Sequence, residues 1–73
     1  MSMIELKADI TGSIWKIVKA VGDSVAEDET VMIMESMKME IPVAATEAGL
    51  LKELCVAEGQ TVETGTVVAR VEV

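Results

Sequence analysis

The sequence predicts an all-β domain in which two small sheets pack face to face. Short apolar segments rich in Val, Ile and Thr alternate with turn signals, and no window sustains a helical face. The second half of the chain also repeats the pattern of the first half. Two copies of one β-unit, related by a pseudo-twofold axis, are the simplest interpretation of this repeat.

The repeat emerges when the sequence is shifted by 37 positions against itself. Identical residues then coincide in the pairs Ile4/Ile41, Ala8/Ala45, Gly12/Gly49, Ala20/Ala57, Gly22/Gly59, Val25/Val62, Val31/Val68 and Glu35/Glu72. Apolar matches such as Ile14/Leu51 and Met34/Val71 extend the pattern. Lys38 would map just past the C-terminus, so we expect both chain ends to lie at the end of the domain opposite this lysine.

Each copy divides into four short strands between turns. In the first copy we expect strands near residues 2–7, 13–19, 24–26 and 30–35. In the second copy we expect strands near residues 39–44, 50–56, 61–63 and 66–72. Eight strands in so short a chain predict two four-stranded sheets that are closed enough to protect their edges.

Several residues mark the turns and the edges of these strands. Gly22 and Gly59 lie in turns and are expected to have positive φ angles. Asp28 occupies the position that Gly65 has in the second copy, and Asp tolerates the left-handed region. Pro42 cannot donate a ladder hydrogen bond, so we expect it on an edge strand or at the irregular end of one.

Composition argues against catalysis, metal binding and nucleic-acid binding. The chain has no histidine and no evident nucleophile–base pair, so no catalytic residue is assigned. Its one cysteine, Cys55, lies in an apolar run and is expected to be a buried thiol. One cysteine, no histidine and scattered carboxylates do not supply the four ligands of a zinc site. A formal net charge of −7 would repel phosphate backbones, and Trp15, the only aromatic residue, cannot form a stacking platform.

Residues 1–73 are expected to form one small domain, monomeric in isolation. The sequence contains no apolar run of about 18 residues, so no membrane span is expected. The first residues also lack the basic segment and apolar core of a signal peptide. A single cysteine allows no intrachain disulfide, which fits a cytoplasmic protein.

Residues 35–40, Glu-Ser-Met-Lys-Met-Glu, join two strand-like segments at the middle of the chain and predict the tip of a β-hairpin. Lys38 is then exposed at that tip. Met37 and Met39 are unusual neighbours, because tight turns favour Asn, Gly or Asp. Flexible thioethers suit surfaces that several partners contact, although the pattern alone is equally consistent with an ordinary turn lysine.

The stretch Glu-Ser-Met-Lys-Met-Glu-Ile-Pro, residues 35–42, resembles the attachment sequence of biotinyl domains, in which Ala-Met-Lys-Met is the commonest form. The resemblance spans essentially the whole chain, because Gly22/Val25 before the motif and Gly59/Val62 after it match the family's spacing. It implies a flattened eight-stranded barrel, or barrel-sandwich hybrid. A stand-alone biotin/lipoyl attachment protein, or an excised biotin carboxyl carrier domain, is the type it resembles most.

The resemblance also implies a function. Lys38 would carry covalent biotin attached by a biotin protein ligase, with Met37 and Met39 serving recognition and Glu35 and Ser36 as further candidates. The tethered biotin would act as a swinging arm that shuttles a carboxyl group between biotin carboxylase and carboxyltransferase. The chain would therefore be a carrier that acts with enzymes and not an enzyme itself.

Two alternatives stay open at this point. Lipoyl domains attach lipoate to the same lysine but usually show Asp-Lys-Ala at the tip, so Met37-Lys38-Met39 favours biotin over lipoate. Glu35 occurs in both groups and does not discriminate between them. The other alternative is an unmodified barrel that acts only as an interaction module.

Overall fold

The computed structural model describes residues 2–73, and this part of the chain folds into strands without a helix. The strands are β1 (Met3–Lys7), β2 (Gly12–Ile17), β3 (Ser24–Val25), β4 (Thr30–Ser36), β5 (Met39–Ala44), β6 (Gly49–Leu54), β7 (Thr61–Val62) and β8 (Val67–Glu72). Every expected strand is present to within two residues at either end, which confirms the all-β class. Residues 2–73 accordingly offer no helix long and apolar enough to cross a membrane.

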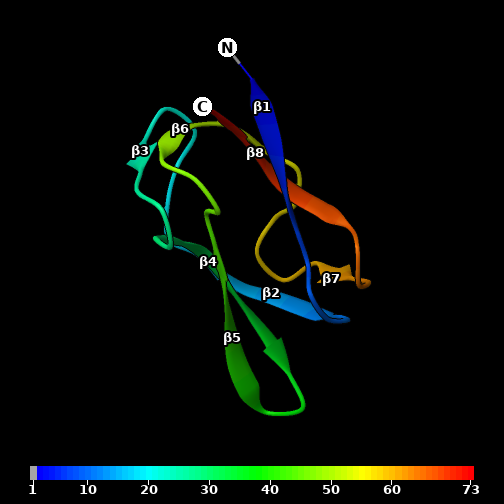
Figure 1. The fold of residues 1–73 in the computed structure, drawn as a ribbon. Helices are drawn as coiled ribbons and strands as arrows, with labels where there is room; N and C mark the ends of the chain where they lie inside the picture. The colour runs from blue at the N-terminus through cyan, green and yellow to red at the C-terminus, as the bar shows by residue number, and fades with distance from the viewer. Residues whose placement is uncertain (1) are drawn as a thin grey trace.

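The strands form two antiparallel four-stranded sheets, with the orders β1-β8-β6-β3 and β5-β4-β2-β7. The sheets pack face to face (Figure 1). Closure into a barrel is only partial, because β1 and β5 are both edge strands and no ladder joins them within the described chain. Pro42 lies on the edge strand β5, as its missing donor predicts.

The internal repeat holds at the level of individual hydrogen bonds. The N–H of Gly22 donates to the carbonyl oxygen of Leu51 at 2.8 Å, and the N–H of Gly59 donates to that of Ile14 at 2.7 Å. Donor and acceptor both move by 37 positions between these bonds. The φ angles of Gly22 and Gly59 are 98° and 89°, so both glycines adopt the expected left-handed conformation.

A second pair of turns follows the same rule. The N–H groups of Asp28 and Gly65 donate to the carbonyl oxygens of Ala45 and Ala8, both at 2.8 Å. Asp28 has a φ of 68° and Gly65 a φ of 89°, which confirms that Asp replaces Gly in a left-handed position. The pseudo-twofold relation therefore covers strands and turns alike.

The core lies between the sheets and draws equally on both copies. Its fully buried side chains include the equivalent pairs Ile14/Leu51, Val31/Val68 and Met34/Val71. No buried residue of the described chain is polar or charged. Burial of matched apolar side chains from two copies is therefore the main favourable contribution to folding.

Cys55 departs from the expectation of a buried thiol, because its side chain is exposed. The β6–β8 pairing contains a bulge between Leu51 and Glu53, and this bulge changes which residues point inward. Partial burial of the sulfur and the adjacent Glu53 carboxylate raise the pKa of the Cys55 thiol, so the thiol is a weak nucleophile at neutral pH.

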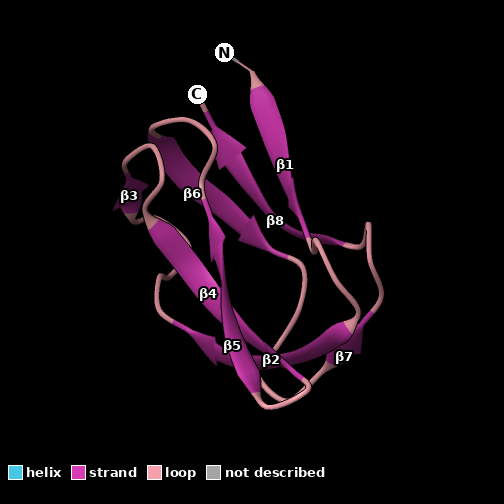
Figure 2. Cartoon of the chain, turned by 60° about the horizontal axis from the view of Figure 1, so that its bottom comes forward, coloured by secondary structure: helices cyan, strands magenta, loops and turns pink. Residues whose placement is uncertain are grey.

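The β4–β5 hairpin projects from one end of the domain, and both chain ends lie at the other (Figures 1 and 2). The molecule is elongated, with extents of 36 × 18 × 17 Å. This arrangement confirms the position that the repeat predicted for Lys38 relative to the termini. A group attached at the tip would therefore stand clear of any chain that continues from either end.

Candidate attachment hairpin

The tip of the hairpin is a two-residue turn made by Met37 and Lys38. Ser36 pairs with Met39 as the last step of the β4–β5 ladder, which leaves only these two residues between the strands. Their φ angles are 52° and 64°, the signs that a type I′ turn requires at both central positions. The ladder below the turn runs back to Thr30 and Ala44, so the tip is held by two long, paired strands.

The left-handed conformation of both turn residues was not anticipated from the sequence. A two-residue hairpin loop requires positive φ, and Asn-Gly is the usual solution, so the loop length was the signal that could have revealed it. For a residue with a Cβ atom the left-handed region costs about 1–2 kcal/mol. Met37 and Lys38 therefore occupy a turn that their side chains do not favour, which points to selection for something other than stability.

The side chains at the tip are exposed. Met37 is 92% exposed and Met39 61%, and Lys38 is exposed between them. None of the ion pairs found in residues 2–73 involves Lys38. Two thioethers and an ammonium group thus project into solvent from the end of two paired strands, available to another protein.

The other two candidates lie just below the turn. Ser36 is half-buried, and its Oγ donates a hydrogen bond to the carbonyl oxygen of Thr11 at 3.1 Å. This bond ties the hairpin to the β1–β2 loop. Glu35 is exposed and lies directly opposite Glu40 on β5, so two carboxylates share one face of the hairpin. Ser36 supports the hairpin from the inside, whereas Glu35 faces solvent.

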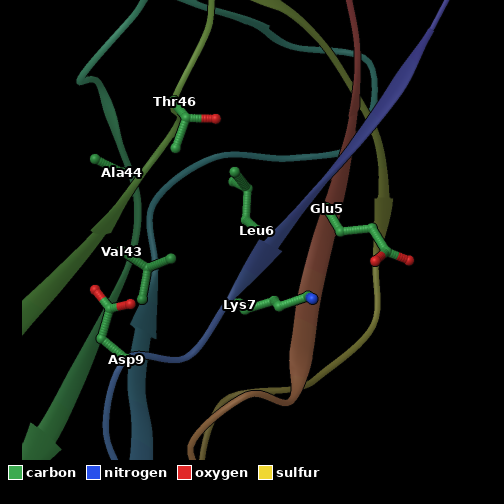
Figure 3. Close-up of a pocket in the computed structure, with 7 residues that line it drawn as sticks. All are labelled: Glu5, Leu6, Lys7, Asp9, Val43, Ala44 and Thr46. Atoms are coloured by element: carbon green, nitrogen blue, oxygen red, sulfur yellow. The ribbon is translucent and has the colours of Figure 1, made fainter.

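A cleft of about 290 Å³ lies away from the tip, between β1 and β5 (Figure 3). Leu6 points towards Val43 and Thr46 across this cleft, and Glu5 and Lys7 point away from it. Leu6 and Val43 are equivalent in the repeat, so the cleft marks the pseudo-twofold axis, where the two edge strands face each other without pairing. It is a gap between sheet edges at the end of β5 remote from Lys38.

Known proteins share the sequence pattern and the fold of this chain. A family model for biotin/lipoyl domains, described as "Biotin-requiring enzyme", matches residues 3–71. The chain belongs to the biotin/lipoyl family. This biotin/lipoyl domain is 41% identical over 58 residues to the biotin/lipoyl attachment protein of Bacillus subtilis, which covers 80% of each chain. It is also 34% identical over 65 residues to a biotinylated protein of Mycobacterium leprae, the TB7.3 homologue, over 89% of this chain and 92% of that one.

Similarity extends to much larger proteins. The urea carboxylase of Kluyveromyces lactis contains a region that superimposes on 99% of the biotin/lipoyl domain with a TM-score of 0.93 and 38% identity. That match spans 6% of the carboxylase chain. The dihydrolipoyllysine-residue succinyltransferase component of the 2-oxoglutarate dehydrogenase complex of Staphylococcus saprophyticus is 44% identical over 66 residues, which are 89% of this chain and 16% of that protein. Relatives named for biotin and relatives named for lipoyl groups therefore share this domain.

Proposed function

We propose that this domain is a biotin carboxyl carrier in which Lys38 is biotinylated by a biotin protein ligase. The observation that carries the proposal is the tip itself, where an exposed lysine stands between two exposed methionines at the end of a paired hairpin. The tethered biotin supplies a ring nitrogen that carries a carboxyl group from biotin carboxylase to carboxyltransferase. Catalysis belongs to those partners, and this chain positions the group.

The hairpin geometry suits the attachment step. The neutral amine of Lys38 attacks the acyl carbon of biotinyl-AMP, the adenylate that the ligase makes from biotin and ATP. An amide bond forms, the acyl–phosphate bond breaks to release AMP, and the amine loses a proton. Exposure at a narrow tip allows the amine to enter the active site of another protein. The paired strands of β4 and β5 hold that tip out from the body of the domain.

Tethering gives the carrier its physical advantage. A group linked covalently to the domain reaches both partner sites at a high effective concentration, in place of free diffusion. Both docking events must then be weak and transient, because a tightly held carrier could not alternate between sites. The long axis of the domain, with Lys38 at one end and the termini at the other, suits such alternation.

Lipoylation of the same lysine is the second candidate, favoured by the 44% identity to the succinyltransferase component. Biotin remains the better supported because Met37-Lys38-Met39 resembles the biotinyl motif, and because one relative that matches nearly end to end is named as biotinylated. Two apolar thioethers in place of an acid and a methyl group change the surface that a ligase must recognise.

The test is intact mass after incubation with biotin, ATP and a purified biotin protein ligase. We expect the parent chain to gain the mass of one biotinyl group and Lys38→Ala to gain none. Lys7→Ala, which removes an exposed lysine of β1 outside the hairpin, is the matched control and should be modified as the parent is. Biotin on Lys38→Ala would contradict the site. If the parent accepted lipoate from a lipoate ligase but no biotin, the result would contradict the biotin proposal and support the lipoyl alternative.

A further inference from the structure

The internal repeat supplies a matched comparison for the surface beside the hairpin. Trp15 is the bulged residue of β2 where it pairs with β4, and Lys52 is the bulged residue of β6 where it pairs with β8. Lys52 Nζ lies 3.6 Å from Glu72 Oε1, and Glu72 is the repeat equivalent of Glu35. Trp15 therefore holds the position from which a lysine in the other copy neutralises the corresponding glutamate.

The fold does not require an indole at this position. Trp15 is 49% exposed, and the side chain of Lys52 is 44% exposed on an equivalent backbone. Both copies thus place this side chain at the surface, and the second copy folds in the same way with a lysine at this position. The only aromatic residue of the chain has been placed where it contributes little to the core. Exposed Trp that packing does not demand is a mark of interaction sites.

The charges beside Trp15 are also unbalanced. Glu35 and Glu40 lie directly opposite each other, an arrangement that destabilises an antiparallel pair. The equivalent pair in the other copy is Glu72 with the neutral Met3. No ion pair within residues 2–73 includes Glu35 or Glu40. The surface around Trp15 therefore has two carboxylates and no paired lysine, whereas the equivalent surface of the second copy has one carboxylate paired with Lys52.

We propose that the surface formed by Trp15, Glu35 and Glu40, here called the Trp15 face, is a docking site for the enzyme that acylates Lys38. That enzyme supplies a Lys or Arg side chain which lies against the indole and pairs with the two carboxylates, in the place that Lys52 takes in the other copy. A cation is attracted both to the face of an indole and to carboxylates. The inference rests on the proposed function, because it identifies how the modifying enzyme recognises the domain.

The acylating enzyme fits this surface better than the partners that act later. The Lys38 amine must itself enter the enzyme's active site on a short side chain, so the enzyme must approach the hairpin closely. Glu35 lies three residues before Lys38, which is within about 10 Å along a strand. Trp15 lies on β2, the neighbour of β4 in the same sheet (Figure 1). Partners served by the extended arm can stand further away.

The repeat provides the test variant. Trp15→Lys places in the first copy the residue that the second copy already accommodates, so we expect its melting temperature to match or exceed that of the parent. With biotin, ATP and a purified biotin protein ligase, we expect kcat/KM for acylation to fall about tenfold or more, mainly through KM. Val21→Lys is the control, because it makes the same charge change at another exposed apolar residue. Val21 precedes Gly22, whose N–H donates to the carbonyl oxygen of Leu51 in the other sheet. This control should change kcat/KM less than about twofold.

A second measurement does not depend on a variant. The chain contains one indole, so an isotope-labelled domain gives a single Trp side-chain N–H resonance. We expect addition of unlabelled ligase to shift or broaden this resonance. An unmoved indole resonance, or a folded Trp15→Lys with parental KM, would overturn the docking proposal while the parent is still acylated. A parent that is not acylated at all would instead overturn the proposed function.

Discussion

Gly12 and Gly49 show how single residues set the shape around the hairpin. A Cβ atom on Gly12 would lie 2.6 Å from the carbonyl oxygen of Glu35, too close for any side chain. Gly49 meets the carbonyl of Glu72 in the same way. Glu35 lies near the C-terminal end of β4, next to the turn of the hairpin. The close approach at Gly12 therefore holds the start of β2 against β4 just below that turn. The identity of these glycines in the repeat therefore has a steric cause.

Met37, which we propose serves recognition, contrasts with Val62, a residue of the core. Met37 is 92% exposed, whereas Val62 is 4% exposed in the core. We expect Met37→Ala to change the free energy of unfolding by well under 1 kcal/mol, because it removes almost no buried surface. Val62→Ala should lower it by roughly 1.5–3 kcal/mol. Chemical denaturation of both variants measures this, and equal destabilisation would show that Met37 belongs to the core.

At the scale of the element, the two turn residues of the hairpin have backbone angles that their side chains do not favour. Met37 and Lys38 both have positive φ, which Asn and Gly adopt with far less strain. Replacement of the first turn residue can therefore separate the demands of folding from those of recognition, without removing the lysine.

We expect Met37→Asn to raise the free energy of unfolding by about 1 kcal/mol, because Asn tolerates the left-handed region. The same change should slow biotinylation of Lys38, because a thioether is lost from the recognition surface. Thermal unfolding and initial acylation rates measure the two effects. Met39→Asn is the control, since Met39 is in β5 and has no positive φ, so it should slow acylation without the gain in stability. A destabilised Met37→Asn would contradict the strain argument.

At the scale of the whole molecule, charge and shape act together. The formal net charge is −7, and the acidic pair Glu35/Glu40 lies beside the tip at one end of a body 36 Å long. The proposed amide at Lys38 would remove the positive charge of its side chain and make this end more negative. A partner that encloses the tip is therefore expected to present basic groups around its entrance.

Electrostatic steering gives a salt dependence that can be measured. We expect the initial rate of biotinylation of the parent to fall as ionic strength rises, because salt screens attraction between exposed charges. The double variant Glu35→Gln/Glu40→Gln should start lower and depend less on salt. The paired variant Glu58→Gln/Glu63→Gln removes the same charge from loops outside the hairpin and should keep most of the parental slope. Superimposable curves for the parent and the hairpin variant would exclude steering.

Much of this architecture could be predicted from the sequence because its signals are local. Turn residues such as Gly22 and Gly59 mark where strands end, and the shift of 37 positions relates the two halves directly. Once the strands are known, the position of Lys38 between two of them follows from chain order alone. The eight strands and the end of the domain that carries the lysine were accordingly predicted.

The tertiary structure decided what depends on contacts between distant segments. The bulge in the β6–β8 pairing turns Cys55 outward, and the one in the β2–β4 pairing turns Lys16 outward after the exposed Trp15; strand alternation in the sequence does not reveal a bulge. The position of Trp15 relative to Glu35 likewise depends on strand pairing, as the equivalent ion pair of Lys52 with Glu72 shows. The sequence by itself determined which segments are strands and where the lysine lies, because turn chemistry and periodicity are properties of neighbouring residues. Register and bulges decide which face of a sheet each side chain occupies. They arise only when two strands pair, so the tertiary structure was needed to assign these faces.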